Sequence, residues 1–242
     1  MNSVSVIMST YSRNKPSFDC PNLLKRALDS VLAQTFRDFE LILIDDGSVD
    51  GSEAVCREYA ARDSRIRYVR HDDNSGRPAL RYNEGILLAK SDYFTFMFDD
   101  DFWFPNAIED LYKAITGEHK NCGMVYGLGA LKRPETTLFI GGEWNMDMLL
   151  NCNLLFNLAV IVKREVINKV GGYDESDIFR RCCDWDLWYR IGMEYSVARI
   201  TVAVGEVTTQ PDGLVNRFPY DYRAMRNVQR RKNRDVPLKG KL

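Results

Sequence analysis

The hydrophobic pattern of the chain centres on a run of apolar residues from Tyr93 to Phe98. The run reads Tyr-Phe-Thr-Phe-Met-Phe, and three acidic residues, Asp99, Asp100 and Asp101, follow it directly. An uninterrupted run of this kind predicts a strand that is buried on both faces, as in the middle of a parallel sheet. The pattern therefore predicts three carboxylates at the carboxyl end of a central strand.

Strands and helices alternate in the first 117 residues. Apolar runs predict the strands, while helically spaced apolar positions and prolines at first turns predict the helices. The predicted order is strand 4–8, helix 21–32, strand 39–44, helix 53–62, strand 66–70, helix 78–90, strand 93–98 and helix 105–115. This order predicts an α/β fold, in which a mostly parallel sheet is flanked by helices.

The pattern becomes shorter and less regular after Gly117. It predicts strands 124–131, 137–140 and 158–162, and helices 146–150, 165–170 and one opening at 184. No repeat, low-complexity segment or clear linker separates the two parts. We therefore expect one domain over residues 1–222, in which 118–222 add a smaller sheet to the part formed by 1–117.

Composition and length fit one globular domain with a small appendage. The 242 residues are 45% hydrophobic and 12% aromatic, which suffices for a sizeable core. No apolar run approaches the length of a membrane span, and the first strand is predicted immediately after the start, without a signal peptide. The six cysteines show no C-x-x-C spacing, so we expect reduced, buried thiols and a cytoplasmic protein.

Charge is unevenly distributed along the chain. Residues 223–242 hold eight Lys or Arg and one Asp, which gives +7, whereas residues 1–222 hold 25 basic and 33 acidic side chains, which gives −8. Such a basic tail predicts contact with an anionic surface, either membrane lipid headgroups or the acidic body of the protein itself. A solvated terminus is an equally good interpretation.

Polar and aromatic side chains follow three of the predicted strands. Tyr11 follows the first strand, Asp46 the second and Asp99–Asp101 the fourth. Ligands of parallel sheets bind beyond the carboxyl ends of the strands, so we expect these residues to converge on one crevice. Crowded carboxylates repel one another unless a cation lies among them, and Mg²⁺ or Mn²⁺ prefers oxygen ligands. The cluster is thus a candidate metal site, with a solvated acidic turn as the alternative.

The order and spacing of seven motifs resemble the family 2 glycosyltransferases of the GT-A fold, in particular the spore-coat polysaccharide type. These enzymes transfer a sugar from a nucleotide diphosphate. The resemblance spans about residues 3–200 and rests on Val4–Arg13, Gln34–Glu40, Asp45–Ser48, Asn83–Gly85, Asp99–Asp101, Val170–Glu175 and Asp184–Trp188. It implies that residues 1–117 are the nucleotide-binding half and that 118–222 are the acceptor-binding half.

The resemblance implies how the nucleotide is bound. Thr10 and Tyr11 would form the turn that holds the base, with Tyr11 stacked on a pyrimidine, and Arg13 would also bind the nucleotide. Asp46 would accept a hydrogen bond from the base ring N–H. Asp99 would contact the ribose.

It also implies the metal ligands and the catalytic base. Asp100 would bind Mn²⁺ or Mg²⁺, with Asp101 as a second candidate ligand, and Asp184 would be the base. Two positions depart from the family pattern: Phe98 replaces the first Asp of the usual metal motif, and Cys183 replaces the Glu that usually precedes the base.

The arginine and histidine positions of the family are also altered. The Arg of the usual Ala-Arg-Asn motif is displaced by one residue, so Arg77 or Arg81 would reach the diphosphate. The His that relatives often carry near the carboxyl terminus is missing, and Gln210 or Asp212 would take its place.

Several aromatic and amide side chains have two interpretations. We expect the aromatic residues after Asp184 to belong to the core. Core or sugar-contacting positions both fit Trp103, Trp144 and Asn157.

The implied reaction is a single displacement with inversion at the anomeric carbon. The donor would be a nucleotide-diphospho-sugar, in the first instance a UDP-sugar, and the acceptor a hydroxyl of a glycan or a lipid-linked molecule, as in polysaccharide biosynthesis. One carboxylate takes the acceptor proton, and a divalent ion neutralises the leaving diphosphate. We expect no nucleic acid partner.

Three other functional classes share parts of this pattern. A phosphoacceptor receiver domain would be about half as long and needs a lysine at a later strand end. A nucleotidyltransferase that forms sugar nucleotides favours a glycine-rich basic loop, which Ser9–Arg13 is not. A sugar-nucleotide binding protein without catalysis is allowed because Cys183 departs from the family pattern.

Overall fold

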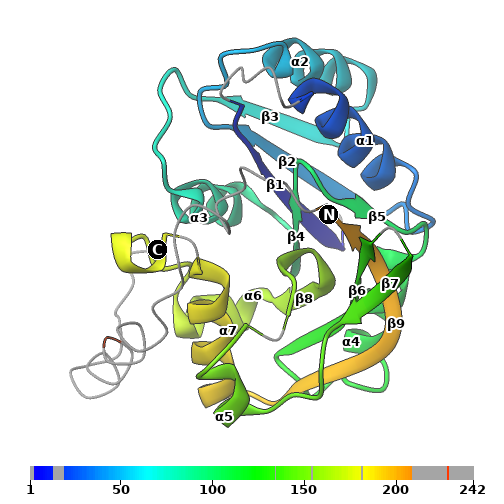
Figure 1. Ribbon diagram of the computed structural model, residues 1–242, viewed down its shortest axis with the longest axis vertical. Coiled ribbons are helices and arrows are strands. Elements are labelled where there is room, and N and C mark those ends of the chain that lie inside the picture. The colour runs from blue at the N-terminus through cyan, green and yellow to red at the C-terminus, as the bar shows by residue number, and fades with distance from the viewer. Residues whose placement is uncertain are drawn as a thin grey trace.

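The computed structural model describes residues 3–12, 19–133, 135–153, 155–180, 182–208 and 228. Its centre is one mixed sheet of nine strands in the order β3-β2-β1-β4-β8-β6-β9-β5, with β7 paired to β6 (Figure 1). The strands are β1 (Val4–Thr10), β2 (Phe39–Asp45), β3 (Ile66–Arg70), β4 (Tyr93–Phe98), β5 (Phe102–Trp103), β6 (Met124–Arg133), β7 (Thr136–Ile140), β8 (Val160–Lys163) and β9 (Val197–Val207).

Strands β3, β2, β1 and β4 form the parallel part of the sheet that the hydrophobic pattern predicted. Val4 of β1 lies opposite Phe39 on one side and Tyr93 on the other. The chain adds β2 and β3 on one side of β1 and then returns to add β4 on the other. Such a reversal of strand order opens a crevice at the carboxyl ends of β1 and β4, where Thr10 and Asp99 lie.

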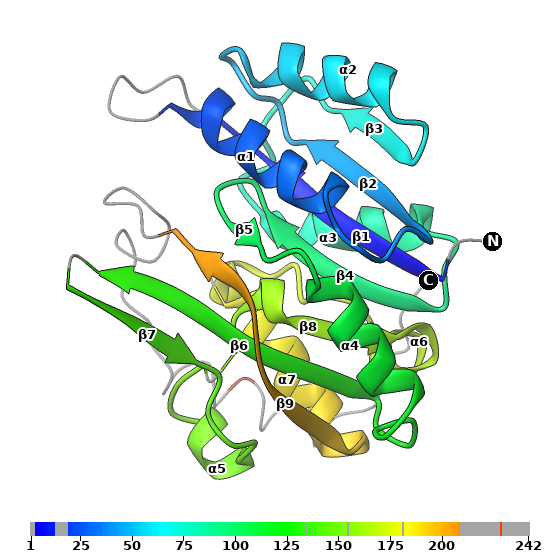
Figure 2. The ribbon, with the colours of Figure 1, turned by 90° about the vertical axis from the view of Figure 1, so that its right-hand side faces the viewer.

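Helices cover both faces of this sheet (Figure 2). Alternate side chains of β1 belong to different hydrophobic clusters: Val4, Val6 and Met8 to one, and Ile7 to the other. The first cluster includes α1 (Cys20–Leu32), α2 (Ser52–Arg62) and α4 (Ala107–Thr116), and the second includes α3 (Pro78–Leu88), α6 (Arg164–Val170) and α7 (Cys183–Glu194). None of the helices in the described part of the chain is long and apolar enough to cross a membrane.

Local sequence explains where the helices begin and how closely they approach the sheet. Asp19 caps α1 by accepting from the backbone N–H of Asn22, and Pro78 opens α3. Gly85 lets α3 lie directly on β1, because a Cβ at this position would come within 2.3 Å of Ile7 Cγ2. Helix α3 is thereby held close to the central strand.

The remaining strands continue the same sheet. β8 pairs antiparallel with both β4 and β6, and β6 pairs parallel with β9. The strands after Gly117, expected as a smaller sheet, are therefore joined to the parallel part. The short helices of this region are α5 (Met146–Leu149), η1 (Asn157–Ala159) and η2 (Asp177–Phe179).

Two strands and one cysteine property differ from expectation. Strands β9 and β5 are not among the predicted strands, although the alternating apolar positions of β9 are a strand signal; β5 has only two residues and therefore no periodicity. All six cysteines are free thiols, but the prediction that all would be buried is wrong. Three are only partly buried: Cys20, Cys122 and Cys152.

Candidate active site

The first acidic group of the site follows β2 and is fully paired within the protein. Asp45 is buried and forms an ion pair with Arg70 at 2.7 Å. Its carboxylate also accepts from the Ser48 backbone N–H at 2.8 Å and from the Tyr68 hydroxyl at 3.2 Å. These partners use the carboxylate to fix the turn after β2, so Asp45 has a structural role.

Asp46 holds the loop after β3 against the end of β2. Its carboxylate accepts from Asn74 Nδ2 at 3.0 Å and from the Ser75 backbone N–H and hydroxyl at 3.1 and 2.8 Å. Arg81 adds an ion pair through Nε. The close approach of the two loops requires Gly47, whose φ is +78° and whose Cβ would lie 2.7 Å from the Asp73 backbone. The predicted base-binding carboxylate thus already has four protein donors.

Arg81 is engaged on its other side as well. Its Nη1 lies 3.2 Å from the Glu84 carboxylate and 3.0 Å from His71 Nε2. Only about an eighth of its side chain is exposed. In this arrangement Arg81 supports Asp46 and has few donors left for a ligand.

The second acidic group, Asp99–Asp101, follows β4 and is differently connected. Asp99 accepts from the Thr10 hydroxyl at 2.6 Å and from the Tyr11 backbone N–H at 3.2 Å, which joins the ends of β1 and β4. Asp101 is buried and accepts from the Thr208 backbone N–H at 2.9 Å. No ion pair joins these three carboxylates to a basic side chain in the described ranges.

Arg26 of α1 supports this acidic turn from the side. Its Nη2 donates to the backbone carbonyl of Asp100 at 3.0 Å and to the Thr208 hydroxyl. Arg26 and Asp101 thereby attach the residue after β9 to the turn after β4. Sequence reasoning missed both Arg26 and Thr208, because a basic residue on a helix and a threonine after a strand carry no signal until the fold brings them together.

Burial and mutual repulsion perturb all three carboxyl groups. Burial, and then the charge of Asp99, raise the pKa of Asp100 to about 7. The pKa of Asp101 is raised well above its ordinary value, first by burial and then by Asp100. Burial also raises the pKa of Asp99, although the hydrogen bonds from Thr10 and Tyr11 lower it in part. A cation at this turn would relieve the cost of ionising the three groups.

The carboxylates of Asp99–Asp101 fit a divalent ion whose coordination shell is completed by the substrate. Within the described residues, no group of three or more His, Cys, Asp or Glu side chains is arranged to hold a metal by itself. Asp99 and Asp100 are both partly exposed, but the carboxylates of Asp99 and Asp101 accept from the backbone N–H groups of Tyr11 and Thr208. Mg²⁺-type ions are usually held by one or two carboxylates together with substrate phosphates and water. Asp100 is the residue best placed for that role.

The third carboxylate of interest, Asp184, lies in the first turn of α7. It accepts from Asn153 Nδ2 at 2.8 Å and from the Trp185 backbone N–H at 2.8 Å. Burial raises the pKa of Asp184 to about 6, and the two hydrogen bonds limit the rise. A partly exposed carboxyl with this pKa is ionised at neutral pH and can accept a proton. Asn153 is a further residue that sequence reasoning missed.

Asp186, two residues further on, has a different environment. It is fully buried and pairs with Arg190 at 2.7 Å. Arg190 in turn donates to the backbone carbonyls of Val170 and Gly172, both at 2.7 Å. Asp186 therefore fastens α7 to the turn after α6 and is unsuited to proton transfer.

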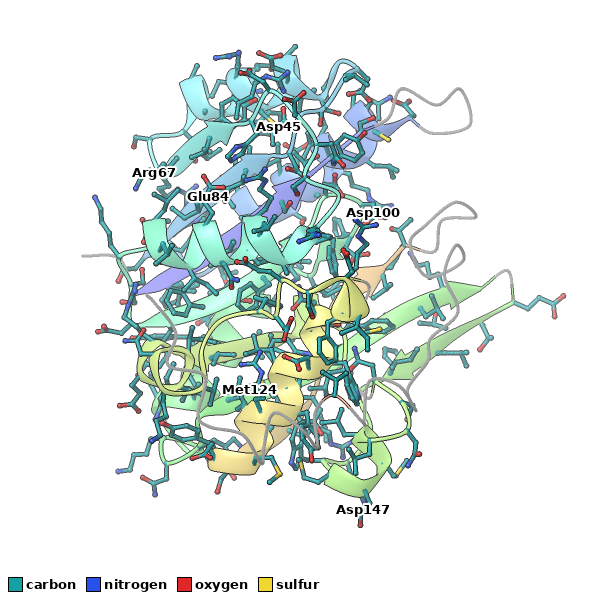
Figure 3. The ribbon with its side chains drawn as sticks, turned by 90° about the vertical axis from the view of Figure 1, so that its left-hand side faces the viewer. Asp45, Arg67, Glu84, Asp100, Met124 and Asp147 are labelled. Carbon is teal, nitrogen blue, oxygen red and sulfur yellow. The ribbon has the colours of Figure 1, made fainter. Side chains whose placement is uncertain are left out.

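Tyr82 of α3 connects the second acidic group with Asp184. Burial raises the pKa of the Tyr82 hydroxyl well above the ordinary value, and Cys183, Asp99 and Asp184 add to the rise. The ring stacks on Tyr173, with 5.1 Å between the ring centroids. The turn after β4 and the start of α7 thus both lie near this tyrosine. Figure 3 shows Asp45 and Asp100 in the upper part of the view, well away from Asp147.

The other predicted residues fall into two groups. Trp103, Trp185 and Trp188 are buried in the core, and the Asn157 Oδ1 accepts from the Tyr173 hydroxyl at 3.0 Å. Trp144 lies at a shallow surface pocket near the far end of α7. Predicted residues outside the described part of the chain are Arg13, Gln210, Asp212 and the basic tail except Val228.

Comparison with solved structures defines the class of fold. The TarS protein of S. aureus in complex with UDP-GlcNAc aligns with a TM-score of 0.77 at 14% identity, over 98% of this chain and 68% of that one. The mannosyltransferase PcManGT of Pyrobaculum calidifontis in complex with GDP-Man and Mn²⁺ aligns with a TM-score of 0.68 at 19% identity, over 97% and 65%. The chain has the GT-A fold, as its motifs predicted.

Sequence comparison then gives the family. Residues 5–139 match the family model for glycosyl transferase family 2, so the chain belongs to that family. It is 35% identical over 124 residues to the glycosyltransferase GlyG of Streptococcus pneumoniae, which is 51% of this chain and 38% of the relative. It is 37% identical over 105 residues to the putative colanic acid biosynthesis glycosyl transferase WcaA of Escherichia coli, which is 43% and 35%. The matched regions span little more than a third of each relative's length.

Proposed function

We propose that the protein is an inverting, metal-dependent glycosyltransferase that moves a sugar from a nucleotide-diphospho-sugar to a hydroxyl group. The donor in this proposal is a UDP-sugar, and the acceptor is a glycan or a lipid-linked molecule. Tyr11 and Thr10 bind the base, Arg13 also binds the nucleotide, and Asp99 binds the ribose. The solved relatives in complex with UDP-GlcNAc and GDP-Man support a donor of this class.

The observation that carries the proposal is the environment of Asp184. This carboxyl has a pKa raised to about 6, is held by Asn153 and Trp185, and acts on the same tyrosine as Asp99. An acceptor hydroxyl becomes a competent nucleophile when a carboxylate within hydrogen-bond reach takes its proton. Since we assign one base and no enzyme nucleophile, attack from the face opposite the diphosphate inverts the anomeric carbon.

The leaving group requires positive charge. A divalent ion, Mn²⁺ or Mg²⁺, would supply it by neutralising the charge that develops on the diphosphate. Asp100 would hold the ion, and Asp101 would hold the end of β9 beside it. Arg26 donates to the Asp100 backbone carbonyl and so holds the turn that carries this carboxylate.

The acceptor site belongs to the half that carries Asp184. We include in the proposal that the basic tail, residues 223–242, brings a cytoplasmic enzyme to an anionic membrane where a lipid-linked or growing polysaccharide acceptor resides. Flotation with anionic liposomes at low and high salt, comparing the full chain with one ending at Tyr222, tests this part. If both proteins stay in the soluble fraction, the membrane contact is removed from the proposal.

The test of the main proposal is nucleotide release from UDP- and GDP-sugars with Mn²⁺, with and without a panel of glycan acceptors. Release that depends on acceptor supports transfer, and NMR of the product reports the anomeric configuration. Binding without acceptor-dependent release would favour a non-catalytic sugar-nucleotide binding protein. Release of pyrophosphate from a nucleoside triphosphate and a sugar phosphate would favour a nucleotidyltransferase.

A further inference from the structure

Two arginines from distant parts of the sequence meet at the start of α3. Arg77 precedes the helix, and Arg180 follows η2, which lies beside α3 in Figures 1 and 3. Arg77 Nη2 lies 3.1 Å from Asp177 Oδ1, and Arg180 Nη2 lies 3.7 Å from the same oxygen atom. One carboxylate oxygen therefore faces two guanidinium groups.

This carboxylate does not satisfy the two guanidinium groups. The pair carries one surplus positive charge, and the distance from Arg180 to Asp177 exceeds that of a hydrogen bond. Arg180 Nε is buried and has no hydrogen-bond partner among the described residues. Buried donors of this kind are normally paired, so an unpaired one indicates a missing partner. Asp177 itself is 70% exposed and can be displaced.

The position of Arg77 and Arg180 indicates which anionic group would bind to both. Arg77 directly follows the segment whose Ser75 holds Asp46, and Arg180 lies four residues before Asp184. The pair is therefore attached to both the proposed base-binding end and the proposed catalytic end of the site. In a nucleotide-diphospho-sugar, the group between the base and the reacting carbon is the diphosphate.

We infer that Arg77 and Arg180 together bind the diphosphate of the donor, with Asp177 occupying the anion position when no donor is present. This inference rests on the proposed function and adds Arg180 to the site. It also decides between Arg77 and Arg81, because Arg81 is already engaged by Asp46, Glu84 and His71. Guanidinium groups suit this role because their paired N–H donors match phosphate oxygens.

The inference is tested by calorimetric binding of UDP, UMP and uridine, and of GDP, in the presence of Mn²⁺. Arg180→Gln and Arg77→Gln should each weaken UDP binding by about tenfold to a hundredfold, the range for hydrogen bonds to a charged group. UMP should be affected less, and uridine should not be affected. Arg180→Lys, which keeps the charge but loses the paired donors, should fall between the wild type and Arg180→Gln.

Asp177→Asn should change binding in the opposite direction. Removing the competing carboxylate should tighten UDP binding by up to about fivefold, the upper range for an exposed ion pair. This side chain is exposed, so the variant should fold as the wild type does. Arg62→Gln is the matched control: it removes one guanidinium from the exposed Arg62–Glu58 pair at the end of α2 and should leave binding unchanged.

Each contrary result has a separate meaning. If UDP binds equally to the wild type and to Arg180→Gln, the two arginines form a surface ion pair only, the inference is overturned, and the proposed function stands. The inference is likewise overturned if Asp177→Asn weakens UDP binding. If the wild type binds neither UDP nor GDP with Mn²⁺, the proposed function fails.

Discussion

The carboxylates after β2 and β4 have the same sequence signature but opposite environments. Asp45 ends β2 and Asp46 follows it, and each is matched by an arginine and by several neutral donors. Asp99–Asp101 follow β4, and in the described part of the chain only hydrogen bonds from neutral groups reach their side chains. One cluster is complete within the protein, and the other needs positive charge from elsewhere.

The same contrast recurs within one turn of α7. Asp186 is buried against Arg190, whereas Asp184 has amide donors. Burial raises the pKa of both carboxyls, that of Asp184 to about 6, and at Asp186 the charge of Arg190 opposes the rise. An ion pair stabilises the charged form of a carboxylate and leaves it little capacity to bind anything else. Reactive carboxylates are therefore expected among those that have no paired cation. Substitution of paired and of unpaired carboxylates should accordingly have different effects.

The largest effect is expected at Asp184. Asp184→Asn keeps the size of the side chain but cannot take a proton, so turnover should fall by about 10²–10⁴-fold. Nucleotide and Mn²⁺ affinities should be nearly unchanged, because a base that acts on the acceptor makes no contact with the donor diphosphate. Steady-state kinetics and calorimetry measure the two quantities.

The control for this variant is Asp147→Asn, an exposed carboxylate of the same half in α5. It changes the charge equally and should leave turnover within about twofold, as expected for an exposed surface residue. Near-normal turnover in Asp184→Asn would show that another group is the base. A product with retained anomeric configuration would reject the single displacement altogether.

Asp186→Asn should act on stability. Loss of the carboxylate leaves Arg190 buried without its counter-charge, and breaking a buried pair in this way costs about 3–5 kcal/mol. Urea unfolding should show this loss, while the folded fraction should retain its turnover per molecule. An unfolding free energy equal to that of the wild type would show that the Asp186–Arg190 pair does not fasten α7.

Asp100 and Asp101 should differ although they are adjacent. Asp100→Asn should weaken Mn²⁺ binding in the presence of nucleotide by about tenfold to a hundredfold, the scale seen when metal-site residues are altered. Asp101→Asn should leave Mn²⁺ affinity within a few-fold, because its carboxylate is used by the Thr208 backbone N–H. Electron paramagnetic resonance of free Mn²⁺ gives both affinities. Equal losses in the two variants would make Asp101 a second metal ligand.

The sequence predicted the strand ends well because local patterns control them. The apolar run before Asp99 and the alternation of strands and helices up to Gly117 determine that Tyr11, Asp46 and Asp99 lie at one edge of the sheet. The order of strands around β1 then follows from general rules of chain connection. This part of the site required no knowledge of side-chain contacts.

The partners of these residues could not be predicted from the sequence. The Asp46 carboxylate forms an ion pair with Arg81, whereas the Asp100 carboxylate forms none with an arginine in the described ranges. Nothing in the local sequence pattern distinguishes these two residues. The contacts of Arg26 with Thr208 and of Arg77 with Asp177 join residues about 100 or more positions apart. Whether a carboxylate is structural or reactive depends on such long-range contacts, which only the folded chain determines.

The smallest effect is a pH dependence of stability that arises at Asp184. The pKa of Asp184 is raised from 3.8 to about 6, so between these values the folded protein binds more protons at this site than the unfolded chain. The unfolding free energy must then fall as pH rises through this window, and above it the loss is complete. Solvent reaches this partly exposed carboxyl, so we expect a loss of about 1–2 kcal/mol.

Asp184→Asn lacks the titration and should therefore gain stability relative to the wild type between pH 4.5 and pH 7.5. Urea unfolding of both proteins in EDTA measures the difference, in which the other carboxylates cancel. Parallel stability curves would mean that Asp184 has an ordinary pKa, and turnover would then have no reason to rise through half of its maximum near pH 6.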